Sequence, residues 1–246
     1  MVIIHMIPKK IHYCWFGKGK HSKEMKKCIK SWKKYCPDYE IIEWNESNFD
    51  ISAHPFVKAA YEAKAWAFVS DYARLKIIYD YGGVYLDTDV ELIRNIDFLL
   101  QNDAYLGVEA QDWLCNTGLG FGAKKHNSII AEMLQIYNEI EFDNSKKSTI
   151  ACPYLNTAVV EKIGYKKQDR IQQLDKITIY PPKYFDPFPS GGSVSILICD
   201  ETVSIHHYSA SWGSWKNKLK RRIARFIGPK LTFKLKKLKI FLITRK

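Results

Sequence analysis

The chain has 246 residues, of which 46% are hydrophobic, and its formal net charge is +12 at pH 7. This length and apolar content indicate one α/β domain with a sizeable core and give no sign of a second domain. Every apolar run falls far short of the ~20 residues that span a bilayer, and the six cysteines form no CxxC pair. We therefore expect neither a transmembrane helix nor a zinc finger.

The amino-terminal segment predicts a strand that leads into a ligand-binding loop. The apolar stretch at the very start is too short for a signal peptide, which predicts a cytoplasmic protein. Residues 11–16 form a β-prone run, and glycines at 17 and 19 follow, where a backbone can approach a ligand closely. Trp15 stands at the end of that strand and suits either core packing or contact with a flat ring. An amphipathic helix over residues 22–35 and a second strand over residues 39–44 come next.

The stretch from residue 65 to residue 91 predicts a helix, a tight turn, a strand and then a pair of carboxylates. Apolar residues recur at helical spacing up to residue 81, and Gly82-Gly83 ends the pattern where a positive φ is needed. Residues 84–86 predict a short, buried, parallel strand, so Asp87-Thr88-Asp89 falls at its carboxyl end. Open α/β sheets bind ligands at that edge, and we expect the functional site there.

These acidic residues have a functional and a structural interpretation. Asp87 and Asp89 would point to opposite faces of a continuous strand, but a turn at this point brings both to one ion. Their hard oxygens suit Mg²⁺ or Mn²⁺. Asp71 and Arg74 lie three residues apart on the preceding helix, where the guanidinium can hold the carboxylate. The structural alternative is a surface salt bridge and two turn aspartates, because short acidic triplets are frequent.

The second half of the domain predicts further alternation of strands and helices. Residues 115–122, CNTGLGFG, predict a turn-rich edge strand where small residues permit the close approach of a ligand, and Asn116 lies in it. A strand over residues 104–108 precedes this segment, and helices over residues 128–139 and 153–163 follow it.

A histidine pair marks the end of the domain. His206 and His207 are adjacent on a predicted strand and therefore point opposite ways, so at most one faces the metal while its neighbour packs or contacts the substrate. A purely structural pair is the alternative. Trp212 or Trp215 nearby can donate its indole N–H to an oxygen of a ligand.

Residues 216–246 hold 13 of the 38 basic residues and no acidic residue, which leaves 25 basic against 26 acidic residues elsewhere. The whole net charge therefore resides in this tail. Its leucines recur at helical spacing and predict a pair of basic amphipathic helices lying on an anionic membrane surface, where each cation contributes about 1 kcal/mol. Nucleic-acid binding and simple packing on the domain are the alternatives, and the apolar stripe argues against nucleic acid.

Three strings together resemble a known family. Residues 70–91, SDYARLKIIYDYGGVYLDTDVE, resemble the sugar-binding region of DXD glycosyltransferases of family 32, which includes bacterial capsule enzymes and yeast initiating mannosyltransferases. Large clostridial glucosylating toxins share this region. Residues 7–17, IPKKIHYCWFG, and residues 205–212, IHHYSASW, are similar to the opening strand and the closing motif of the family, so the resemblance spans most of residues 7–215.

The resemblance implies a single GT-A (Rossmann-like) domain with a mainly parallel sheet over residues 1–215, followed by the tail. It implies that Asp89 ligates Mn²⁺ or Mg²⁺ and that Asp87 bridges metal and ribose. It also implies that Asp71 and Arg74 hold the donor sugar and that Asn116 lies near it. Trp15 would stack on the base, and His206 or His207 would be a third metal ligand. The other expected contacts of the nucleotide sugar are Ser70, Gly83, Thr88, Ser211, Trp212 and Trp215.

The function implied is metal-dependent, retaining transfer of a hexose or N-acetylhexosamine. The donor would be a UDP-sugar, with GDP-mannose as the alternative, and the acceptor a lipid-linked or oligosaccharide glycan of bacterial capsule or O-antigen. The enzyme would lie at the inner face of the cell membrane and bind no nucleic acid. A haloacid-dehalogenase-type phosphatase with Asp87 as nucleophile is an alternative of another class. Against it, about a third of the chain precedes the motif and no GDxxxD pair follows.

Overall fold

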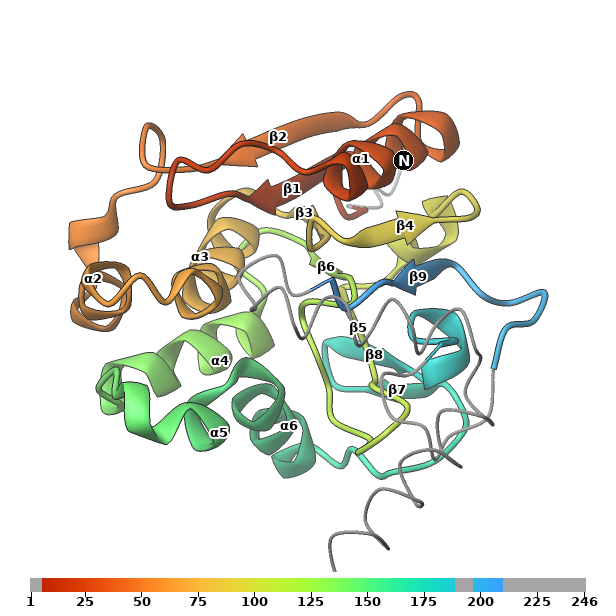
Figure 1. Cartoon of the computed structure of the whole chain (residues 1–246). Coiled ribbons are helices and arrows are strands. Elements are labelled where there is room, and N and C mark those ends of the chain that lie inside the picture. The colour runs from red at the N-terminus through yellow and green to blue at the C-terminus, as the bar shows by residue number, and fades with distance from the viewer. Residues whose placement is uncertain (1–5, 189–196, 210–246) are drawn as a thin grey trace, which may run out of the picture.

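The computed structural model describes residues 6–188 and 197–209, and its centre is a seven-stranded sheet with the order β2-β1-β3-β6-β5-β8-β7 (Figure 1). A separate two-stranded ribbon, β4-β9, lies beside it. The strands of the large sheet are β1 (Lys10–Cys14), β2 (Glu40–Trp44), β3 (Gly83–Tyr85), β5 (Ala104–Gly107), β6 (Phe121–Ala123), β7 (Gln172–Leu174) and β8 (Ile177–Tyr180).

Most strands of this sheet run in one direction. β1 pairs in parallel with both β2 and β3, and β5 pairs in parallel with β8. β6 runs antiparallel to both β3 and β5, which gives those two the same direction, and β7 runs antiparallel to β8. The expected mainly parallel α/β sheet is confirmed. The segment expected at the edge instead forms the central strand β6, because Gly122 has no Cβ to meet the Tyr105 ring and the Gly83 carbonyl.

Helices cover both faces of the sheet. One apolar cluster joins the sheet to α2 (Pro55–Glu62), α3 (Trp66–Tyr81), α4 (Ser128–Glu139) and α6 (Cys152–Lys162), with the short α5 (Lys147–Ile150) beside them. The second cluster joins the other face to α1 (Lys23–Tyr35). The described residues also form short 3₁₀ helices, which are η1 (Ile51–Ala53), η2 (Asp97–Gln101), η3 (Asn144–Lys146) and η4 (Pro182–Tyr184).

The end of α3 fixes where the acidic triplet lies. The helix ends at Tyr81, and Gly82 and Gly83 follow with φ of 64° and 112°. A Cβ on Gly83 would lie 2.9 Å from His12 Nε2, so only glycine fits both the conformation and the space. The chain therefore turns directly into β3, as its glycine pair predicts.

The ribbon brings a distant segment to the same place. β9 (Ser204–His206) pairs antiparallel with β4 (Val90–Leu92), and Val90 lies opposite His206 (Figure 1). Trp32 of α1 donates its indole N–H to the Val90 carbonyl at 2.8 Å, which anchors the ribbon to the domain. The histidine pair therefore lies beside the acidic triplet.

Within the described residues, no helix is long and apolar enough to cross a membrane.

The six cysteines are free. Five of them are buried, as we expect of small core residues, but Cys199 is exposed. The tail of residues 216–246 lies outside the described residues.

Candidate functional site

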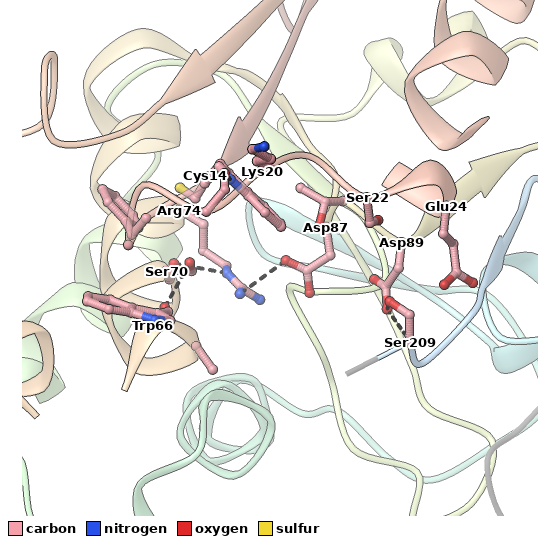
Figure 2. A pocket seen from close by; sticks show the side chains of 16 residues that line it. Cys14, Lys20, Ser22, Glu24, Trp66, Ser70, Arg74, Asp87, Asp89 and Ser209 are labelled. Carbon is pink, nitrogen blue, oxygen red and sulfur yellow. Dashed lines mark hydrogen bonds and ion pairs between the residues drawn. The ribbon is translucent and has the colours of Figure 1, made fainter. Parts of the chain in front are cut away.

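A cavity of about 510 Å³ opens at the carboxyl ends of β1 and β3 (Figure 2). The β1–α1 loop, the first turns of α3 and the acidic triplet enclose it. The residues that matter chemically are Trp15, Trp66, Ser70, Arg74, Asp87 and Asp89. This is the sheet edge at which the topology predicts a ligand.

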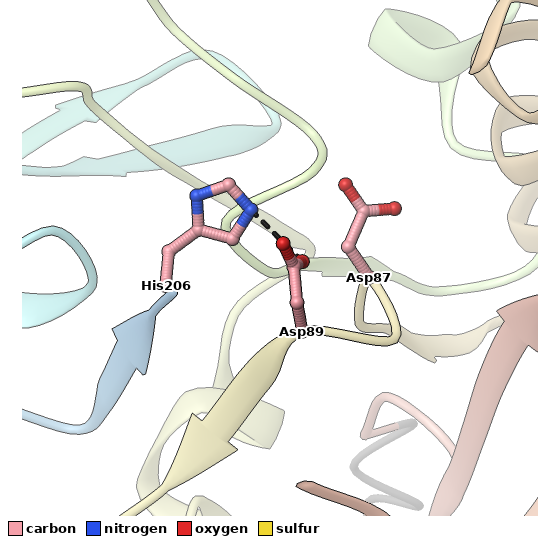
Figure 3. Close-up of side chains that lie close together, drawn as sticks. All are labelled: Asp87, Asp89 and His206. Carbon is pink, nitrogen blue, oxygen red and sulfur yellow. Dashed lines mark ion pairs between the residues drawn. The ribbon is translucent and has the colours of Figure 1, made fainter. Parts of the chain in front are cut away.

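The acidic triplet turns so that both carboxylates and one histidine meet. The Val90 N–H donates to the Asp87 carbonyl at 2.9 Å and closes the turn. Asp87, Asp89 and His206 each offer a ligand atom, and these three atoms lie within 4.8 Å of one another (Figure 3). They come from the end of β3, the start of β4 and the end of β9, so folding alone assembles the cluster.

Asp89 is held as an anion by its neighbours. His206 Nε2 lies 3.1 Å from Asp89 Oδ1, and Ser209 donates its N–H and its hydroxyl to Asp89 Oδ2 at 2.8 and 3.0 Å. Burial by itself raises the pKa of Asp89, but His206 and Ser209 outweigh it and hold that pKa below its usual range. Burial likewise lowers the pKa of His206, yet the Asp89 carboxylate raises it to about 9.

Asp87 has a different environment from Asp89. Burial raises the pKa of Asp87 to about 6, although the Arg74 charge opposes that rise. Arg74 lies 3.2 Å from Asp87 Oδ1, and the Tyr85 hydroxyl donates to the same oxygen at 3.0 Å. Arg74 is also fixed by its Nε, which donates to the Ser70 carbonyl at 3.0 Å.

Asp71 supports Arg74 from behind. Its Oδ1 lies 3.2 Å from an Arg74 nitrogen, and both side chains are buried. Burial raises the pKa of Asp71, and Arg74 together with hydrogen bonds from Cys152, the first residue of α6, opposes the rise. Asp71 is not among the residues that line the cavity. Arg74 is thus held between the carboxylates of Asp71 and Asp87. Of Asp71 and Arg74, Arg74 is the residue that lines the cavity.

The cluster has the donor set of a divalent-cation site. Two carboxylate oxygens and one imidazole nitrogen suit Mn²⁺ or Mg²⁺. A cation can replace the contact between His206 Nε2 and Asp89 Oδ1, because a ligand atom of Asp87 lies within 4.8 Å of those of both residues. The residues present therefore fit such an ion.

The structure separates the two histidines. His207 Nε2 lies 2.8 Å from Glu91, and that carboxylate also accepts from Lys27 at 2.9 Å. His207 therefore contacts Glu91 rather than the acidic pair, and of the two histidines it is His206 that joins Asp87 and Asp89.

The remaining predicted residues fall into three groups. Trp15, Ser70 and Thr88 line the cavity with Arg74 and the aspartates. Gly83 does not line it, because it lies buried in β3 against His12. Asn116 does not line it either: its side chain donates to Glu109 and accepts from the Gly118 N–H at 2.6 Å. Ser211, Trp212 and Trp215 lie outside the described residues.

Several residues at this site were not singled out from the sequence. Ser209 could have been, because it lies within the string IHHYSASW. Tyr85 shares the strand face of Asp87 at spacing i, i+2, a signal that was available. Trp66 gave no such signal, because its position depends on a contact with Gly17 that only the folded chain creates. Gly118 belongs to the expected small residues of 115–122, but its closeness to Asp87 likewise depends on the fold.

Three comparisons with known proteins bear on this site. Residues 22–106 match the family described as "Glycosyltransferase sugar-binding region containing DXD motif". Over 127 residues the chain is 32% identical to "Inositol phosphoceramide mannosyltransferase 3" of Schizosaccharomyces pombe. This match covers 49% of this chain and 34% of that protein. The chain thus spans about a third of the length of this relative.

A solved structure supports the same assignment at the level of the fold. The structure of "PaToxG Glycosyltransferase" superposes with a TM-score of 0.53 at 20% identity and covers 64% of this chain and 70% of that one. The GT-A-like α/β fold and the family resemblance expected from the sequence are confirmed. The chain therefore contains, in residues 22–106, the DXD-containing sugar-binding region of glycosyltransferases.

Proposed function

We propose that the chain is a metal-dependent glycosyltransferase that takes a sugar from a nucleotide-diphosphate donor. The observation that carries this proposal is the cluster of Asp87, Asp89 and His206 at the border of the 510 Å³ cavity. These three residues would hold Mn²⁺ or Mg²⁺. A cation bound there neutralises the charge that develops on a departing nucleotide diphosphate.

The chain's own residues divide the remaining tasks. Trp15 lines the cavity and offers a flat face for the base, and its indole N–H donates to the Gly19 carbonyl at 2.7 Å, which fixes the ring. Arg74 faces the donor sugar, and Asp71 acts on it through Arg74. Ser209 keeps the Asp89 carboxylate oriented. The bond from the anomeric carbon to the diphosphate oxygen breaks, the acceptor oxygen bonds to the anomeric carbon on the same face, and its proton passes to the departing diphosphate, so that the configuration is retained as in the resembling enzymes.

We favour a UDP-sugar as donor, carrying a hexose or an N-acetylhexosamine. GDP-mannose is the second candidate, and it is supported by the 32% identity to a protein named as a mannosyltransferase. The phosphatase alternative is weaker, because Asp87 follows β3, which is the third strand of the chain and not its first, and its Oδ1 is held by Arg74 and Tyr85.

The acceptor and location follow from the same proposal. A lipid-linked or oligosaccharide glycan of bacterial capsule or O-antigen would be the acceptor. The catalytic domain would comprise residues 1–215, and the basic tail of residues 216–246 would hold it at the inner face of the cell membrane. The tail's lack of acidic residues supports attraction to anionic lipid.

A nucleotide-release assay tests the proposal. Purified protein with Mn²⁺ is incubated with UDP-glucose, UDP-galactose, UDP-N-acetylhexosamines or GDP-mannose, and free UDP or GDP is measured. We expect release from one donor, suppression by EDTA, and a loss of about 100-fold in Asp89→Asn. Asp80→Asn is the matched control, because Asp80 pairs with Lys76 on the surface of α3. Unchanged release in Asp89→Asn would contradict the proposal, and hydrolysis of an aryl phosphate that Asp87→Asn abolishes would favour the phosphatase.

A further inference from the structure

A second group of buried polar side chains lies behind the proposed metal cluster. Asp186 is 1% exposed, and its Oδ2 accepts the Ala110 N–H at 2.9 Å. Its Oδ1 has no hydrogen-bond partner among residues 6–188 and 197–209. The Nδ1 atom of His206 is likewise buried and without a hydrogen-bond partner within these ranges. One unused acceptor and one unused ring nitrogen therefore coexist in the interior.

The two atoms belong to segments that are fastened together. The Val203 N–H donates to the Tyr184 carbonyl at 2.8 Å, and the Thr202 hydroxyl donates to the Lys183 carbonyl at 2.8 Å. These bonds tie η4, which Asp186 follows, to the chain that enters β9, which ends at His206.

Tyr208 connects the same two residues. Its ring centroid lies 4.1 Å from that of His206, and burial together with the charge of Asp186 raises the pKa of its hydroxyl. Burial raises the pKa of Asp186 and lowers that of His206, and the charge of each group opposes the effect of burial on the other.

The orientation of the imidazole ring separates the roles of its nitrogens. Nε2 faces Asp89 at 3.1 Å, whereas the other ring nitrogen lies on the far side of the ring, away from both aspartates (Figure 3). When Nε2 ligates a cation, Nδ1 must carry the remaining proton. A metal-bound histidine usually donates that N–H to a carboxylate or carbonyl, which fixes the ring and raises its basicity. A buried N–H without an acceptor would be costly.

We propose that Asp186 is a positioning residue, whose Oδ1 accepts the Nδ1–H of His206 when Nε2 binds a divalent cation. The proposal rests on the metal site of the proposed function. A cation at Nε2 leaves the ring proton on Nδ1, and the bond to Asp186 then gives a partner to both buried atoms.

The other carboxylates around His206 are already engaged. Asp87 and Asp89 lie on the Nε2 side of the ring and are the ligands themselves. Glu109 lies close enough for its charge to be coupled to His206, but it accepts the side-chain N–H of Asn116. Among the described carboxylates near His206, Asp186 is thus the one with a buried oxygen that accepts no hydrogen bond. Glu109 in turn is a matched control, because neutralising it removes one negative charge from the same group.

The first test is calorimetric titration of Mn²⁺ into the native chain, Asp186→Asn and Glu109→Gln. We expect Asp186→Asn to weaken Mn²⁺ binding 10- to 100-fold and Glu109→Gln to weaken it by less than about threefold, as for the loss of a remote charge. Equal losses in the two variants would overturn the proposal, because charge alone would then explain them. Native affinity in Asp186→Asn would overturn it too. If the native chain binds no Mn²⁺ at all, the metal site of the proposed function also fails.

The second test is made on the native chain and therefore does not depend on how Asp186→Asn folds. Nitrogen-15 NMR of the Mg²⁺-loaded protein reports which ring nitrogen of His206 carries the proton, and His206→Gln identifies the signal by its loss. We expect protonated Nδ1, with a downfield, slowly exchanging proton. A ring protonated on Nε2 in the presence of Mg²⁺ would overturn the proposal.

Discussion

His12 shows how a single buried side chain determines the geometry of the site. Its Nε2 lies 3.0 Å from the Gly82 carbonyl, and its Nδ1 accepts the Trp44 indole N–H at 3.0 Å. Both contacts are met only by the neutral tautomer that carries its proton on Nε2. The ring therefore fills the space beside Gly83 and supports the turn that leads to the acidic triplet.

We predict that His12 makes the fold less stable at acidic pH. Burial lowers the pKa of His12 to about 4 from the ordinary value of 6.5. The unfolded chain takes up this proton below about pH 6.5, but the folded chain does so only near pH 4. The free energy of unfolding is therefore unaffected by this proton above pH 6.5 and falls between pH 6.5 and 4, by up to about 3 kcal/mol. Urea unfolding of the native chain and His12→Gln across this range measures it, and parallel pH profiles would contradict it.

The residues of the site could be predicted from the sequence where they are local. Arg74, Asp87 and Asp89 lie within one helix, turn and strand, so their spacing already places them at one sheet edge. The role of Asp186 could not be predicted in this way, because it depends on a buried oxygen without a hydrogen-bond partner and on His206, which lies on another segment. For His206 and His207, the sequence restricts the metal contact to one of the two, and the pairing of β9 with β4 brings His206 to the acidic pair.

At the level of elements, the mainly parallel sheet could be predicted from the sequence, but the central antiparallel strand β6 could not. Periodicity gave the parallel strands and the helices, because both depend on local apolar spacing. The antiparallel insertion of β6 between β3 and β5 depends on glycines that permit close contact with neighbouring strands. In the turn before β6 the Asn116 side chain therefore bonds to Glu109 and to the Gly118 N–H and does not line the cavity.

Gly118, in that turn, yields a prediction about the element. A Cβ at this position would overlap the Asp87 carboxylate and would lie 3.1 Å from an Arg74 nitrogen. We expect Gly118→Ala to displace Asp87 and to weaken Mn²⁺ binding about tenfold in calorimetry. Gly164→Ala is the control: the added methyl group meets nothing within 4 Å, although its φ of +104° costs about 1 kcal/mol of stability. Native Mn²⁺ affinity in Gly118→Ala would show that this close approach does not matter.

For the whole molecule, the distribution of charge separates a near-neutral domain from a basic tail. We predict that the full chain floats with vesicles containing phosphatidylglycerol and not with neutral vesicles. Glutamine in place of Lys230, Lys234, Lys236, Lys237 and Lys239 should abolish flotation, because each cation contributes about 1 kcal/mol at an anionic surface.

The matched control for the tail lies on α1. Glutamine at the five exposed positions Lys23, Lys26, Lys30, Lys33 and Lys34 changes the net charge equally but leaves the tail intact. Flotation should persist in this variant. Equal loss in both sets would show that overall charge, not the tail, drives the attraction, and binding to duplex DNA in place of vesicles would favour the nucleic-acid alternative.

The account depends most directly on metal-dependent binding of a nucleotide diphosphate. The measurement is calorimetric titration of UDP and of GDP into the native chain and Asp89→Asn, each with Mn²⁺ and with EDTA. We predict that UDP binds the native chain only with Mn²⁺ and that this binding is lost in Asp89→Asn, since Asp89 and His206 form the centre of the cluster. Binding of GDP alone would instead identify the mannose donor. Binding of neither nucleotide under any condition would contradict the account.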